Sequence, residues 1–131
     1  MPERRTHIKY DILLAEKYNL NVTIEDITLI ETIIDHPNRL PNSLKKVFQE
    51  CDIHPSLNAS LLGFHIKGVM RHDWNSSLGR ELLYKLLSCL FSEDALLIAE
   101  LHFALDSIWE NRPIGDISPL VKSFLEEMGL L

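Results

Sequence analysis

The sequence predicts an all-α protein: a single domain over residues 1–131, in which about six to seven helices form a bundle. Apolar residues recur at helical spacing, and clusters of Pro, Asn, Ser and Gly separate these stretches. The third observation is the stretch 92–111, SEDALLIAELHFALDSIWEN, whose apolar arc is wider than an ordinary amphipathic stripe. We therefore expect a buried helix near residues 93–110 at the centre of the bundle, with Ser92 as its N-cap.

Two helices are predicted before residue 36. Residues 6–18 fit a first helix, whose buried face is expected to carry Ile8, Ile12 and Ala15. Thr23 begins the sequence TIED, an Asp variant of the capping box, ahead of a second helix that ends near residue 35. The Ile and Thr content of this segment would also suit a strand, but its isoleucines keep helical spacing.

The middle of the chain alternates turns and helices. The sequence HPNRLPN at 36–42 is the clearest loop, and short helices are expected over 43–52 and 56–71. After the turn at 73–77, leucines at i, i+4 spacing predict a helix over 78–91. This helix and the central one are joined only at residues 92–94, which predicts an antiparallel helical hairpin.

The last helix is predicted from its ends. Ser118 followed by Pro119 is the usual start, a cap and then a proline, and Gly129 ends the helix. The two cysteines, Cys51 and Cys89, lie among apolar residues and are interpreted as reduced and buried, with a disulfide between them left open.

The charge is uneven along the chain. Residues 93–131 carry two basic and eight acidic side chains, so this part alone matches the net charge of -6 of the whole protein. Such a surface repels nucleic-acid phosphates and attracts basic proteins. The longest apolar run, 95–99, is too short for a membrane span, and the N-terminal residues lack a signal peptide, so we expect a cytoplasmic location without membrane contact.

Six histidines raise the question of a metal site. His72 is followed directly by Asp73; a single histidine, His36 or His54, precedes this pair, and Asp106 follows it. This order resembles the ligands of HD-type metal-dependent phosphohydrolases. The resemblance implies that these residues bind a divalent metal, which activates water for attack on a phosphate ester.

The sequence favours a structural interpretation of the histidines over this enzymatic one. His102 and Asp106 lie four positions apart on the central helix and can touch each other there. The chain is short for such an enzyme, and its acidic last third would repel a phosphorylated substrate.

The function predicted first is therefore non-enzymatic: an acidic protein-protein interaction module without a cofactor, such as an inhibitor, immunity-type or antitoxin-type protein that covers a basic partner. Acidic side chains would steer the partner, and apolar ones would anchor it. The residues expected in this interface are Leu96, Glu100, Phe103, Asp106, Glu110, Glu126 and Glu127. A homo-oligomer is left open.

Overall fold

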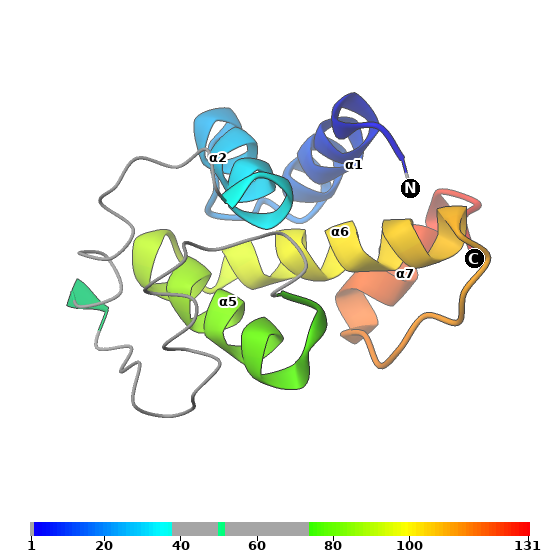
Figure 1. Ribbon diagram of the computed structural model, residues 1–131. Helices are drawn as coiled ribbons and strands as arrows, with labels where there is room; N and C mark the ends of the chain where they lie inside the picture. Colours follow the sequence, from blue (N-terminus) through cyan, green and yellow to red (C-terminus); the bar gives the residue numbers. More distant parts are fainter. Residues whose placement is uncertain (1, 38–49, 52–73) are drawn as a thin grey trace.

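Helix α6 lies between two layers of helices in the computed structural model, which describes residues 2–37, 50–51 and 74–131 (Figure 1). Within these residues there are five helices and no strand, which confirms the all-α prediction. The helices are α1 (Arg4–Lys17), α2 (Ile24–Asp35), α5 (Ser77–Leu90), α6 (Asp94–Trp109) and α7 (Pro119–Glu127). The helices expected over 43–52 and 56–71 fall outside the described residues, apart from 50–51.

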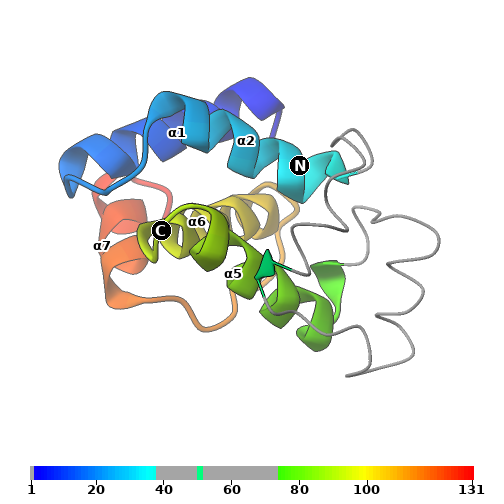
Figure 2. The ribbon, with the colours of Figure 1, turned by 90° about the vertical axis from the view of Figure 1, so that its left-hand side faces the viewer.

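The central position of α6 follows from its apolar surface. Helices α1 and α2 lie along one side of α6, and α5 and α7 lie on the other (Figures 1 and 2). Seven α6 side chains are buried, among them Ile98, Leu101 and Leu105 at 0% exposure. A helix packed on both sides needs apolar residues nearly all round, and this is what residues 94–109 provide.

The α1–α2 hairpin starts its second helix with the predicted capping box. The Asp26 amide donates to Thr23 Oγ1, and the Thr23 amide donates to a carboxylate oxygen of Asp26, both at 3.0 Å. These bonds satisfy two amides that would otherwise lack a partner at the helix start. Asn19, at φ +51°, makes the turn before it.

The predicted face of α1 is confirmed in part. Ala15 is buried, and Ile8 and Ile12 are half-buried and pack against the core. The fully buried stripe of α1 also contains His7 and Asp11, two ionisable side chains that the apolar pattern did not predict.

The predicted N-cap of α6 is also wrong. The Ser92 hydroxyl donates to the Asn21 carbonyl at 2.9 Å, and Glu93 occupies the cap position without a side-chain hydrogen bond to the helix. The Asp94 carboxylate accepts a hydrogen bond from the backbone N–H of Asn21 at 2.6 Å. The start of α6 is thus held by the turn after α1.

Helix α5 begins at Ser77, one residue before the predicted start, and α7 begins at the predicted Pro119, although the Ser118 hydroxyl at its cap position makes no hydrogen bond to the helix. Ser76 caps α5 by accepting a hydrogen bond from the Gly79 amide at 2.9 Å, and Pro119 stands in the first turn of α7. Gly129, at φ +72°, follows α7 in the left-handed conformation that glycine adopts at low cost.

The cysteines are not reduced core residues: Cys51 and Cys89 form a disulfide, and Cys89 is exposed. The bond attaches residue 51 to the end of α5. Among the described helices, none has the length and apolar character to cross a membrane.

Candidate metal centre

Three helices each contribute one pair of ionisable residues, four positions apart, to the interface of α1, α2 and α6. This spacing places both members of a pair on one face of a helix. We call the six residues the His-carboxylate cluster: His7 and Asp11 from α1, Glu31 and Asp35 from α2, and His102 and Asp106 from α6.

The His102 imidazole lies at the centre of the His-carboxylate cluster. Its Nδ1 is 2.7 Å from a carboxylate oxygen of Glu31. Its Nε2 lies 3.4 Å from Asp35 Oδ1 and 3.3 Å from Asp106 Oδ2. One ring therefore faces three carboxylates from two helices.

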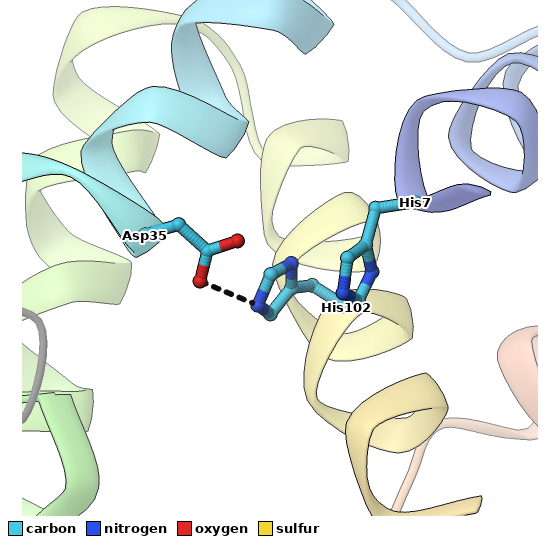
Figure 3. A group of neighbouring side chains, drawn as sticks. All are labelled: His7, Asp35 and His102. Carbon is cyan, nitrogen blue, oxygen red and sulfur yellow. Dashed lines mark ion pairs between the residues drawn. The ribbon is translucent and has the colours of Figure 1, made fainter. Parts of the chain in front are cut away.

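The second imidazole, His7, stacks on the first. The two ring centroids are 3.9 Å apart and the planes differ by 16°. His7 Nε2 also lies 3.1 Å from Asp106 Oδ1. Figure 3 shows His7 and His102 side by side, with the Asp35 carboxylate directed at His102; one ligand atom from each of the three lies within 4.8 Å of the others.

This cluster is buried, and some of its polar atoms have no partner. His7, Asp11 and Glu31 are 0% exposed, and His102 is 1% exposed. Four buried side-chain atoms of the described structure have no hydrogen-bond partner when Asp11 and Glu31 are both ionised: His7 Nδ1, both carboxylate oxygens of Asp11 and the second oxygen of Glu31. A proton on Asp11 links this side chain to Glu31 by a hydrogen bond. Buried polar groups are normally paired, so these atoms are available to a cation or a proton.

The carboxylates determine the protonation state of His102. Burial alone would lower the pKa of this imidazole, but hydrogen bonds with Asp106, Asp35 and Glu31 outweigh burial and raise the pKa well above its ordinary value. Burial alone would raise the pKa of Asp106. The hydrogen bonds and charges of His102 and His7 outweigh burial, and the pKa of Asp106 falls below its ordinary value. Without a metal, His102 is therefore an imidazolium among carboxylates.

The other end of the cluster holds two carboxyl groups close together. Burial and the negative charge of Glu31 raise the pKa of Asp11 well above its ordinary value. Burial also opposes ionisation of Glu31, but its hydrogen bond with His102 lowers its pKa. In the metal-free protein the pair thus favours one carboxylate, Glu31, and one neutral carboxyl group, Asp11.

Of the residues in the HD-type resemblance, the structure places Asp106 in this cluster. His36 caps the C-terminus of α2 and is not in the cluster. His54, His72 and Asp73 lie outside the described residues.

The residues predicted for a partner interface are distributed over several elements. Glu100 accepts a hydrogen bond from the Ser118 amide, and the Arg80 guanidinium of α5 lies 3.4 Å from the centroid of the Phe103 ring. Leu96 is half-buried. The structure does not gather these three side chains with Asp106 on one free surface.

The remaining three interface residues are exposed. Glu110 pairs with Arg112, and Glu127 pairs with Lys17 of α1. Glu126 is exposed on α7. These acids remain accessible to a partner.

Four cluster residues were missed by the sequence analysis: His7, Asp11, Glu31 and Asp35. Their signal is the i, i+4 spacing that they share with His102 and Asp106, repeated once in each of three helices. The His102–Asp106 contact itself was predicted and is confirmed. No protein-family model matches the chain, and comparisons with curated proteins and with solved structures give no match either.

Proposed function

We propose that this protein binds a divalent transition-metal ion, with His7, Asp35 and His102 as ligands. The observation that carries the proposal is the convergence of these three side chains, from three helices, to within 4.8 Å in the protein interior. A cation at this position offsets the negative charge of neighbouring carboxylates that are otherwise expensive to bury.

The donor atoms indicate which ions fit. Imidazole nitrogen favours Zn²⁺, Fe²⁺ and similar ions, while carboxylate oxygen suits Mn²⁺ and harder ions. A mixture of the two donor types therefore favours Fe²⁺, Mn²⁺ or Zn²⁺ over Ca²⁺ or Mg²⁺.

Glu31 supports the orientation of one ligand. It accepts a hydrogen bond from His102 Nδ1 at 2.7 Å, which leaves His102 Nε2 facing Asp35 and Asp106. Metal-binding histidines commonly donate their other N–H group to a carboxylate in this way. Once His102 loses its Nε2 proton, this hydrogen bond keeps the remaining proton on Nδ1, which is the tautomer that a metal at Nε2 requires.

The test is the metal content per chain after purification and after incubation with Mn²⁺, Zn²⁺ and Fe²⁺. We expect at least one tightly bound ion in the wild-type protein and an affinity at least tenfold lower in Asp35→Asn. Asp116→Asn, which changes an exposed loop aspartate, is the matched control and should bind like wild type. No bound ion under any condition would reject the proposal.

A metal-dependent phosphohydrolase of HD type remains the enzymatic version of this function. Asp106, which it requires, is in the His-carboxylate cluster. A metal ion would supply an activated water for attack on a phosphate ester. The metal-loaded protein should then be assayed with phosphate monoesters and diesters, and activity that is lost in Asp106→Asn would support the enzymatic version.

A second candidate is the acidic interaction module that binds a basic protein. It is favoured by two exposed apolar side chains beside acids: Trp109, 41% exposed next to Glu110, and Met128, 37% exposed near Glu126. Such pairs could anchor and steer a partner in the manner of an inhibitor or immunity protein.

This candidate is tested with two exposed acids, one at each apolar side chain. Glu110→Lys combined with Glu126→Lys should weaken binding to a basic nuclease at low salt by about tenfold. Glu81→Lys, on the exposed side of α5, is the control for charge reversal elsewhere. Equal affinity of both variants for the nuclease would count against the acidic surface.

A further inference from the structure

The His-carboxylate cluster contains more donor atoms than one metal ion uses. An ion held by His7, Asp35 and His102, with Asp106 beside it, leaves Asp11 and one oxygen of Glu31 unused. These two side chains are fully buried, and their unpaired oxygens belong to α1 and α2.

The unpaired atoms are concentrated in one part of the cluster. Of the five buried side-chain atoms without a hydrogen-bond partner in the described parts of the chain, four belong to His7, Asp11 and Glu31. The fifth, the Ser118 hydroxyl, lies outside the cluster. The concentration points to a second ligand at Asp11 and Glu31 rather than to scattered packing defects.

The charges lead to the same conclusion. The cluster holds four carboxyl groups, from Asp11, Glu31, Asp35 and Asp106, together with two imidazoles that must be neutral to bind metal. With Asp11 protonated, one divalent ion leaves one negative charge uncompensated, whereas a second divalent ion that displaces this proton balances all four carboxylates. Four carboxylates and two histidines are also the ligands with which helical proteins hold two metal ions in a bundle core.

We infer that the cluster binds a second divalent metal ion at Asp11 and Glu31, beside the ion at His7, Asp35 and His102. The inference rests on the proposed function, because a second ion presupposes the first. The competing occupant is a proton on Asp11, directed at Glu31.

The experiment counts ions in the full-length protein. The chain is freed of metal with a chelator, dialysed against Mn²⁺ and analysed for manganese per chain, with the electron paramagnetic resonance spectrum recorded on the same sample. We expect two Mn²⁺ per chain and the broadened spectrum of two interacting ions. Asp11→Asn should bind one Mn²⁺ and give the spectrum of an isolated ion, while the control Asp116→Asn keeps both ions.

The outcomes separate the inference from the proposed function. One ion per chain in wild type and in Asp11→Asn alike would overturn the second site and leave the proposed function standing. No ion in wild type would overturn both. Loss of both ions from a folded Asp11→Asn protein, with an unchanged helical circular dichroism spectrum, would overturn the assignment of Asp11 to the second ion alone. If Asp11→Asn does not fold, Asp11→Ser is measured in its place. The ion count of the wild-type protein by itself still decides between one ion and two.

Discussion

The His102 side chain shows how strongly a residue's surroundings determine its chemistry. A histidine on the surface of a helix titrates near neutrality and binds metal weakly. Here the ring is 1% exposed, and three carboxylates lie within 3.4 Å of its two nitrogens. The same contacts that stabilise an imidazolium would also surround a bound cation with negative charge, so proton and metal compete for one position.

This competition predicts the pH dependence of metal binding. Hydrogen bonds with Asp106, Asp35 and Glu31 outweigh the effect of burial and raise the pKa of His102, so the metal-free ring carries a proton at neutral pH. That proton must leave before Nε2 can bind metal. The affinity for Zn²⁺ or Mn²⁺ should therefore rise as the pH increases from about 6 to about 8, by up to about tenfold per pH unit for each proton released.

The measurement is a competition titration against a chelator whose own pH dependence is known. His7, stacked on His102, and Asp11, near Glu31, are the other titratable groups that face the site. An affinity that does not change with pH would show that the ligands are already deprotonated in the metal-free protein.

Asp11 provides a second prediction at the residue scale, on stability without metal. Burial and the charge of Glu31 raise its pKa in the folded state, so folding becomes less favourable as the pH rises above the ordinary carboxyl pKa towards the raised one. Asp11→Asn removes this effect. In the presence of a chelator the variant should be more stable than wild type at neutral pH, by on the order of 1 kcal/mol, and the difference should shrink near pH 4.

Urea denaturation at the two pH values, with Asp116→Asn as the control, measures the difference. Added metal should reverse the order of the two proteins, because the variant loses a ligand of the second ion. A metal-free Asp11→Asn protein that is less stable than wild type at neutral pH would contradict the assigned environment of Asp11.

At the scale of the helices, the sequence predicts most where the signals are local. The capping box at Thr23, the Ser118–Pro119 start of α7 and the apolar surface of α6 each lie within one helix or next to its end, and all three are confirmed. The Ser92 cap failed because its hydroxyl has a tertiary partner, Asn21, 71 positions earlier in the chain. No local pattern identifies such a partner.

The His-carboxylate cluster was missed for a related reason. Hydrophobic periodicity assigns polar residues to solvent, and it therefore did not predict that His7 and Asp11 are buried beside Ile8 and Ile12. The rule fails where polar side chains from several helices satisfy one another. The i, i+4 spacing identifies a pair within each helix, but no pattern in the sequence shows that the three pairs meet.

The capping box gives the prediction at this scale. Thr23→Ala removes the hydroxyl that accepts the Asp26 amide, so the free energy of unfolding should fall by about 1 kcal/mol. Ser123→Ala, at an exposed position within α7, is the matched control and should be neutral or slightly stabilising. Thermal denaturation of the two variants checks the difference; equal melting temperatures would mean that the capping box contributes nothing.

At the scale of the whole molecule, two features join distant parts of the chain. The cluster joins α1, α2 and α6, with contacts that span 71 residues between Glu31 and His102 and 99 residues between His7 and Asp106. The disulfide joins residue 51 to the end of α5, which packs on the other side of α6 (Figures 1 and 2). Separations of this length explain why neither feature followed from sequence patterns.

The disulfide also bears on where the protein functions. Structural disulfides persist in oxidising compartments and are rare in the reducing cytoplasm. The Cys51–Cys89 bond therefore fits an oxidising compartment better than the cytoplasmic location that the sequence predicts. The redox state of the two cysteines in protein isolated under alkylating conditions tests that location directly.

The metal-loaded cluster and the disulfide should contribute independently to stability. The cluster residues belong to α1, α2 and α6, whereas the disulfide joins residue 51 to α5. Reduction should lower the free energy of unfolding by roughly 2–4 kcal/mol, since a closed loop restricts the unfolded chain. Chelation should remove a separate contribution, set by the metal concentration relative to its dissociation constant. Urea denaturation of wild type and of the Cys51→Ser, Cys89→Ser double variant, each with and without metal, measures the contributions of the disulfide and of the metal. If the double variant keeps its fold but no longer binds metal, the cluster depends on the disulfide, and the two sides of α6 are coupled.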